Sequence, residues 1–281
     1  MLDRDGHHGP ERTGRRACHS AGRLSVPEVM SIMILFHNSG YRSRKHFCQK
    51  ESCVKLLHLF PQVVSKSRFM EQEKGAAIPL GVFTRKVLMG KCTGIIFVDS
   101  TPLRVCRNQR IHIQKTSKGF AARGKCSVGC LLVLSLHLIC SEKGEVLHFM
   151  VAPGEEDERK PLENRRFIEM IFDKLVADKG YISKALFQKL FVNGMQLITK
   201  QKSNMKGAPM SASGRVLLPK RSIIETINDE LKKNAGVERS RHRIVRNLAV
   251  NLLGTIAAYR YFPKKPAMQV ARVYDNQLTL S

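Results

Sequence analysis

The chain has 281 residues, and its 48 Lys and Arg outnumber its 23 Asp and Glu, which leaves a formal net charge of +25 at pH 7. An excess of this size favours a polyphosphate such as nucleic acid over a small-molecule substrate, and makes a membrane surface the weaker alternative. The sequence has no apolar stretch of the roughly 18 residues that a membrane-spanning helix needs, and it begins without the apolar run of a signal peptide. We therefore expect a cytoplasmic protein with no membrane partner.

The N-terminal third of the chain predicts an arm followed by helices. Residues 1–22 are rich in Arg, His and Gly and have almost no periodic apolar pattern, which predicts an irregular basic arm. Residues 26–36 combine a proline near the start with regularly spaced apolar side chains and predict a helix. Residues 56–60 predict the beginning of another helix, which Pro61 ends. Together these helices predict a small helical domain over residues 23–90.

The next part of the chain has the pattern of strands. Residues 95–98 predict a short buried strand that ends at Asp99. Residues 136–140 and 146–151 predict the two strands of a hairpin, with the turn near Gly144. We therefore expect the first acidic residue of interest, Asp99, at the end of a strand.

A second acidic residue, Asp178, follows a second apolar run. Apolar side chains at helical spacing predict a helix over residues 166–175, and residues 175–177 lead directly into Asp178. A helix is predicted over residues 183–192 and a strand over residues 196–199. This order of elements is what a layered α/β fold of the ribonuclease H-like, or retroviral-integrase-like, class requires, so we predict such a core preceded by the small helical domain.

The last predicted helix has one apolar and one charged face. Taken at 100° per residue, Ile224, Ile227 and Leu231 share the first face, and Arg221, Glu225 and Lys232 cluster on the second. On the charged face, Glu225 could hold Mg²⁺ while its cationic neighbours bind phosphates. The residues from Ser222 to Glu225 also match a capping box, in which Glu225 only bonds to the start of the helix. The sequence pattern leaves both interpretations open.

Two long stretches without acidic residues border two of the candidate carboxylates. Residues 100–141 contain seven Lys or Arg and no acid, and residues 200–224 contain six Lys or Arg and no acid. Such runs are often solvated surface, but here they adjoin Asp99 and Glu225 and favour a nucleic-acid track. Carboxylates kept beside a polyanion have a reason to hold Mg²⁺, so Asp99, Asp178 and Glu225 predict a two-metal site. We predict phosphate contacts from eight cations: Arg104, Arg107, Arg110, Lys118, Arg123, Lys125, Arg221 and Lys232.

With these motifs the chain resembles the DDE transposases of bacterial insertion sequences, and most closely the insertion-sequence-982 family. The resemblance covers about residues 23–268. Seven segments carry it: Phe97-Val-Asp-Ser-Thr-Pro-Leu103, Lys118-Gly-Phe-Ala-Ala-Arg-Gly-Lys125, Ala177-Asp-Lys-Gly-Tyr181, Gln196-Leu-Ile-Thr-Lys200, Arg221-Ser-Ile-Ile-Glu-Thr-Ile-Asn-Asp-Glu-Leu-Lys232, Ser240-Arg-His-Arg243 and Phe262-Pro-Lys-Lys-Pro266. So many segments in the same order are a specific signal.

The resemblance implies a DNA transposase whose catalytic residues and metal ligands are Asp99, Asp178 and Glu225. It implies two Mg²⁺ ions, which Mn²⁺ could replace, and double-stranded DNA as the partner, both as element ends and as target. It also implies a nucleoid-associated bacterial protein and is compatible with a homodimer on DNA. The predicted parts are an arm, a DNA-binding helical domain, a DDE catalytic domain and a tail: residues 1–22, 23–90, 91–265 and 266–281.

The chain also departs from the family pattern. Residues 130–135 are an apolar run where the family has aromatic, glycine and lysine residues, and Leu218 stands where related enzymes often have tyrosine. These departures keep open an inactive remnant that binds DNA without catalysis. A metal-dependent nuclease of the same fold is a second alternative. A basic, nonenzymatic nucleic-acid-binding protein, in which the three carboxylates only cap or stabilise turns, is a third.

Overall fold

The computed structural model describes most of the chain, including the parts that carry the three candidate carboxylates. The described residues are 24–50, 56–62, 64–107, 122–126, 129–154, 156–200, 212–239 and 245–268, with the backbone alone at 105–107, 122–126, 129–132, 239 and 245. The predicted arm over residues 1–22 and most of the predicted tail lie outside them. No helix in this part of the chain is both long and apolar enough to span a membrane.

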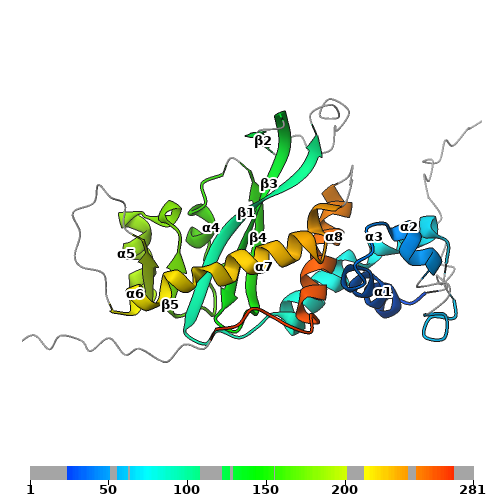
Figure 1. The fold of residues 1–281 in the computed structure, drawn as a ribbon, viewed down its shortest axis with the longest axis horizontal. Coiled ribbons are helices and arrows are strands. Elements are labelled where there is room, and N and C mark those ends of the chain that lie inside the picture. The colour runs from blue at the N-terminus through cyan, green and yellow to red at the C-terminus, as the bar shows by residue number, and fades with distance from the viewer. Residues whose placement is uncertain are drawn as a thin grey trace, which may run out of the picture.

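The centre of the molecule is a six-stranded mixed sheet (Figure 1). Its strands are β1 (Ile95–Arg107), β2 (Ala122–Cys126), β3 (Gly129–Ser141), β4 (Val146–Pro153), β5 (Asp173–Ala177) and β6 (Met195–Thr199). Strand β3 pairs antiparallel with β1, β2 and β4, whereas β5 is parallel to both β1 and β6. An antiparallel meander continued by two parallel strands is the ribonuclease H-like topology, so the predicted fold class is confirmed.

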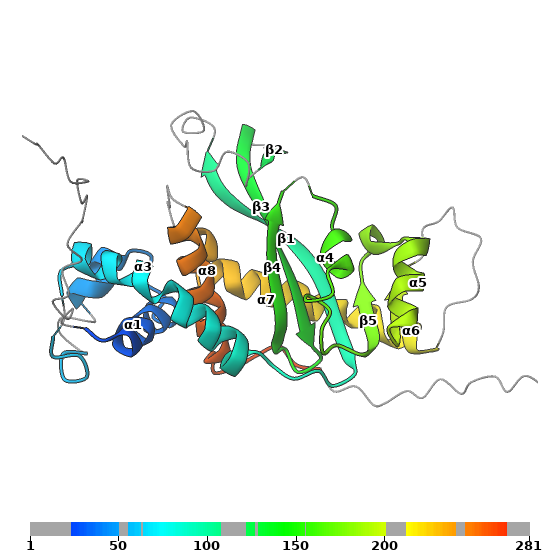
Figure 2. The same cartoon turned by 180° about the vertical axis from the view of Figure 1, so that it is seen from behind.

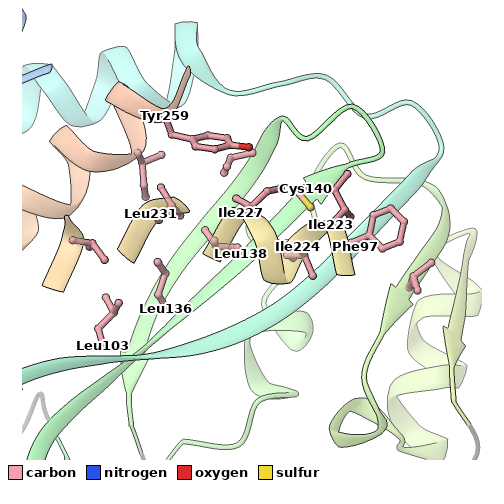
Figure 3. Close-up of a cluster of buried hydrophobic side chains, with 14 of the residues drawn as sticks. Phe97, Leu103, Leu136, Leu138, Cys140, Ile223, Ile224, Ile227, Leu231 and Tyr259 are labelled. Carbon is pink, nitrogen blue, oxygen red and sulfur yellow. The ribbon is translucent and has the colours of Figure 1, made fainter. Parts of the chain in front are cut away.

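Helix α7 (Ser222–Lys233) crosses one face of this sheet, in front of it in Figure 1 and behind it in Figure 2. Phe97 on β1 packs in the same apolar cluster as Ile224 and Ile227 on α7 (Figure 3). The neighbouring residues Ile96 and Val98 belong to the cluster on the opposite face. Because side chains alternate between the faces of a strand, Asp99 lies on the α7 face and Ser100 on the other.

Short helical segments cover the second face. They include α4 (Lys160–Glu163) and α5 (Lys184–Val192), which contribute Leu162, Leu186 and Leu190 to the second cluster. Helix α6 (Ala212–Leu217) and the 3-10 turn Pro219–Arg221 lead into α7, and a further 3-10 turn, Val237–Arg239, follows it.

A layer of helices lies at the other end of the molecule from α5 (Figures 1 and 2). It contains α1 (Val26–Asn38), α2 (Arg44–Phe47), α3 (Lys66–Phe83), the π-helical turn Thr84–Leu88 and α8 (Val245–Arg260). Helix α8 contributes Val250 to the cluster formed with α1 and α3, and Ile256 to the cluster beneath α7. One helix therefore joins the helical layer to the sheet, and the division of the chain near residue 90 stays a prediction.

Several of the predicted elements are present. Helix α1 begins after Ser25, whose side chain forms a capping box with Glu28. The hairpin of β3 and β4 turns at Gly144, which has a φ of 70°. Helix α5 begins after Ser183, whose side chain accepts a hydrogen bond from the backbone N–H of Leu186. In each case a short local signal, a cap or a turn, defines the boundary.

The predicted helix over residues 166–175 is wrong. Residues 165–170 form turns, and the chain then enters β5 at Asp173. Met170 and Asp173 have φ values of 65° and 71°, which a right-handed helix does not tolerate. Phe167 and Ile168 are nevertheless buried against the sheet, so their spacing reflects successive turns and not a helix face.

Two other boundaries also differ from the predictions. Residues 56–60 form a turn and not the start of a helix, and the amides of Leu59 and Phe60 both bond to the carbonyl of Leu56. Strand β1 does not end at Asp99 but continues to Arg107. It does so because it pairs with β3 beyond this point, where Leu103 lies opposite Leu134.

Candidate active site

One guanidinium group lies among carboxylates from three separate elements. Arg221 Nη1 is 3.6 Å from Asp99 Oδ1, and Arg221 Nη2 is 4.0 Å from Asp178 Oδ1. Arg221 Nη2 also donates a hydrogen bond to Glu225 Oε1 at 2.5 Å. Residues far apart in the sequence therefore meet around a single side chain.

The sheet register explains why the two aspartates are neighbours. Phe97 on β1 lies beside Val176 on the parallel strand β5. Asp99 on β1 and Asp178, the first residue after β5, each follow two residues later, so they occupy matching positions along neighbouring segments. Since Phe97 and Val176 both belong to the cluster under α7, the two aspartates are expected on the α7 face as well.

The first turn of α7 supplies the third carboxylate, and the residue that caps this helix, Arg221, supplies the guanidinium. Arg221 and Glu225 are four residues apart, a spacing that puts two side chains on one helix face. Ile224 and Ile227 are completely buried on the other face of α7 and hold the helix against the sheet. The amphipathic pattern that the sequence predicts for this helix thus determines which residues face the aspartates.

The capping-box interpretation of Glu225 is wrong. The N-cap residue of α7 is Arg221, Ser222 lies inside the helix, and no side-chain cap hydrogen bond is present at this end. The Glu225 carboxylate instead accepts a hydrogen bond from Arg221. Glu225 is therefore part of the charged cluster.

Asn228 is a site residue that the sequence analysis missed. Its Nδ2 donates a hydrogen bond of 3.1 Å to Asp99 Oδ2, and the residue is buried. The signal was available, because Asn228 is a polar residue on the apolar face of α7, between Ile227 and Leu231. A buried polar side chain needs a partner, and here the partner is a candidate catalytic carboxylate.

Burial dominates the electrostatics of Asp99. Loss of solvent around this carboxyl raises its pKa from the ordinary 3.8 to about 6, although Arg221 acts in the opposite direction. The negative charges of Glu158 and Glu225 add smaller increases. The folded protein therefore holds the charged form of Asp99 at a cost in free energy.

This cost predicts a pH-dependent stability in metal-free protein. A folded-state pKa above the unfolded value means that the stabilising contribution is complete below pH 3.8 and is lost as the pH rises through about 6. At 1.36 kcal/mol per pKa unit, the loss is about 3 kcal/mol. Asp99→Asn should remove this pH-dependent loss. Between pH 4 and pH 7.5, the free energy of unfolding of the mutant should therefore rise by about 3 kcal/mol relative to that of wild type, as measured by urea unfolding with a chelator present.

The matched control is Asp229→Asn, which changes an exposed carboxylate on the same helix that is paired with Lys233. This variant should show no comparable gain as the pH rises. Identical pH profiles for Asp99→Asn and wild type would contradict the raised pKa.

The donor chemistry of the cluster suits a divalent cation, because three carboxylates surround one positive charge. In the described residues, no three Asp, Glu, His or Cys side chains are arranged to hold a metal ion as they stand. The carboxylates contact Arg221 instead. Binding of a metal ion between them would therefore require the guanidinium to move.

The other predicted cations are spread along the molecule. Lys232 is half-buried on α7, two turns or about 10 Å from Glu225. Arg104 is exposed on β1, about 16 Å along the strand from Asp99, and its backbone N–H donates to Glu238. Arg107 lies at the end of β1, and β2 contains Arg123 and Lys125, where the ends of β1, β2 and β3 project beyond the body of the sheet (Figure 1). Arg110 and Lys118 lie outside the described residues.

A family model described as a transposase DDE domain matches residues 89–245, more than half of the chain. The chain belongs to this transposase family. The match includes the whole sheet, helix α7 and the three carboxylates around Arg221. No curated protein sequence matches the chain.

Solved structures similar to this DDE transposase include three complexes of Mos1. The Mos1 strand transfer complex has 13% sequence identity and a TM-score of 0.29, and the similarity covers 83% of this chain and 68% of that one. The Mos1 paired-end complex with the left transposon end has 14% identity and a TM-score of 0.28, with 82% and 69% covered. The Mos1 mariner paired-end complex with Mn has 14% identity and a TM-score of 0.28, with 81% and 68% covered. Family membership rests on the sequence match.

Proposed function

We propose that this DDE transposase cuts and joins DNA at the ends of an insertion sequence, with Asp99, Asp178 and Glu225 as its catalytic carboxylates. The observation that carries the proposal is their common contact with Arg221, because unrelated caps and turns have no reason to meet at one point. The finer assignment, to the insertion-sequence-982 family of bacteria, is supported by the sequence motifs around these residues.

The three carboxylates would hold two Mg²⁺ ions, or Mn²⁺ in their place. Such ions lower the pKa of a bound water or hydroxyl and neutralise charge on a phosphate undergoing displacement. Asp99 would contribute oxygen donors from β1, Asp178 from the residue that follows β5, and Glu225 from α7. Asn228 fixes the orientation of Asp99 through its hydrogen bond.

The cations at the start and near the end of α7, Arg221 and Lys232, are assigned to the DNA backbone. Once released from the carboxylates, the Arg221 guanidinium can form two parallel hydrogen bonds with a phosphate. Lys232 is two turns further along the same helix. Double-stranded DNA lying along α7 would then contact both residues, and a homodimer would let two such sites act on two element ends.

The test is a joining assay with DNA that ends in the inverted repeats flanking the reading frame. Purified protein with Mg²⁺ should cut the ends and join the freed 3′-hydroxyls to target DNA. Hydrolysis without joining would make the protein a nuclease of the same fold. Specific binding without cutting would make it an inactive remnant, and failure of both cutting and specific binding would overturn the proposal altogether.

The remnant alternative rests on residues 130–135, and the fold weakens it. This run lies inside β3, which continues through it from Gly129 to Ser141. Leu134 within the run is buried, and its partner on β1 is Leu103. The unusual segment therefore forms part of a strand of the central sheet, although the register with β1 shifts opposite Leu132 and Val133.

The salt dependence of DNA binding should decrease with each phosphate-binding cation that is removed. Arg104→Ala and Lys232→Ala should each reduce the slope of log affinity against log salt by about one unit, because each residue would release one counterion on binding a phosphate. The measurement is DNA affinity by fluorescence anisotropy at several salt concentrations.

The control for this series is Lys184→Ala, which removes an exposed charge from α5, beyond the sheet from α7. Its slope should equal that of wild type. An unchanged slope in both Arg104→Ala and Lys232→Ala would remove these two residues from the DNA-binding surface.

A further inference from the structure

A fourth carboxylate touches the segments that carry the two aspartates. Ser100 Oγ donates a hydrogen bond of 2.8 Å to Glu158 Oε1, and Ser100 directly follows Asp99. The other oxygen, Glu158 Oε2, lies beside Gly180, where an added Cβ atom would be only 2.7 Å away. Gly180 is two residues after Asp178, so one side chain spans both segments.

The position of Glu158 differs from that of the catalytic carboxylates. Ser100 lies on the face of the sheet opposite α7, and Glu158 approaches from the short connection between β4 and α4. Glu158 therefore contacts the two aspartate segments from the sheet face opposite α7, and it does not lie among the carboxylates that surround Arg221.

An added side chain at position 180 would collide with the Glu158 carboxyl group. No positive φ is found at Gly180, so its backbone does not require glycine. Among the described residues, apart from its two neighbours in the chain, the atoms within 4 Å of the space for a Cβ at Gly180 belong to the Glu158 carboxyl group. A methyl group at this position would displace this carboxyl group, which is the end of a flexible side chain, and would weaken its hydrogen bond to Ser100.

We propose that Glu158 is a positioning residue that sets the distance between Asp99 and Asp178 by holding Ser100 and the turn at Gly180. This role rests on the proposed function, in which those two aspartates act together on a metal ion. The hydrogen bond is exposed and adds little to global stability. Its loss should therefore change the site more than the fold.

The experiment combines Glu158→Ala and Gly180→Ala with their double mutant. Mn²⁺ affinity, measured by electron paramagnetic resonance without DNA, should fall about tenfold in Glu158→Ala, as is usual when a group supporting a ligand is lost. Gly180→Ala should also lower the affinity. The double mutant should be no worse than Glu158→Ala alone, because the clash at Gly180 disappears with the carboxylate.

Two further variants separate position from charge. Glu158→Gln keeps an oxygen that can accept the Ser100 hydrogen bond, so it should recover part of the affinity that Glu158→Ala loses. Glu163→Ala removes an exposed carboxylate from α4 and should behave like wild type. Melting temperatures should stay close to wild type in all of these proteins.

Hydrogen exchange provides a readout that does not depend on metal. In Glu158→Ala, the amides of residues 178–182 should exchange several-fold faster than in wild type, because their turn has lost its support. Unchanged exchange rates in Glu158→Ala would overturn the positioning role. So would a Gly180→Ala substitution that lowers Mn²⁺ affinity equally in wild type and in Glu158→Ala. Failure of wild-type protein to bind Mn²⁺ would instead overturn the proposed function, and the exchange rates would still decide the role of Glu158.

Discussion

Asp99→Ala and Glu225→Ala should each abolish DNA joining while leaving DNA binding largely intact. The loss should be at least about 10³-fold, because charge stabilisation of several kcal/mol by bound metal corresponds to that factor at 1.36 kcal/mol per tenfold. Binding should survive because it depends on the cations, and removal of a negative charge does not repel phosphate. A joining assay and an affinity measurement on the same preparations test both statements.

Asp229→Asn is the matched control for these variants. Asp229 lies on α7 but is exposed and paired with Lys233, so this variant should join DNA as wild type does. Joining activity close to wild type in Asp99→Ala or Glu225→Ala would remove that carboxylate from the catalytic set. Equal loss of joining and binding would indicate that the substitution has disturbed the fold.

Arg221→Ala should change metal affinity and activity in opposite directions. Because the guanidinium contacts all three carboxylates, it competes with a metal ion for them. Its removal should tighten Mn²⁺ binding without DNA by about fivefold, the equivalent of an exposed ion pair of about 1 kcal/mol. Joining should fall about 10²-fold, because in the proposed function Arg221 donates to a phosphate and this charged donor would be lost.

Two companion variants make this result specific to the Arg221 side chain. Arg215→Ala removes the same charge from an exposed position on α6 and should leave metal affinity unchanged. Arg221→Lys keeps the charge but loses the planar guanidinium group. Its Mn²⁺ affinity should therefore return close to that of wild type, whereas its joining activity should stay well below wild type. Weaker Mn²⁺ binding in Arg221→Ala would mean that the guanidinium holds the carboxylates in place and does not compete with the ion.

The amphipathic pattern of α7 was predictable from the sequence because a helix repeats every 3.6 residues. It correctly separated Ile224 and Ile227 from Arg221 and Glu225. The same rule failed at residues 166–175, where successive turns bury Phe167 and Ile168 with a spacing that resembles a helix. Periodicity shows which side chains need burial, but different backbones can satisfy that need.

The partners of the candidate carboxylates could not be predicted in the same way. Asn228 bonds to Asp99, and Glu158 bonds to Ser100, across sequence separations of 129 and 58 residues. No local pattern encodes such contacts, because they depend on how the packed elements are aligned. The side chains were visible in the sequence, but their partners were not.

The sequence by itself determined the types and order of the groups in this transposase. It contains three acids in recognisable motifs, two stretches of cations without acids and a helix with opposed apolar and charged faces. These properties follow from local chemistry and periodicity. The tertiary structure alone decided that Asp99 and Asp178 lie side by side at one end of the β1–β5 pairing and that Arg221 lies among the three carboxylates. It also decided that Glu158 contacts the segments that carry the two aspartates. Strand register and helix packing are set by contacts between distant residues, and these exist only once the chain has folded.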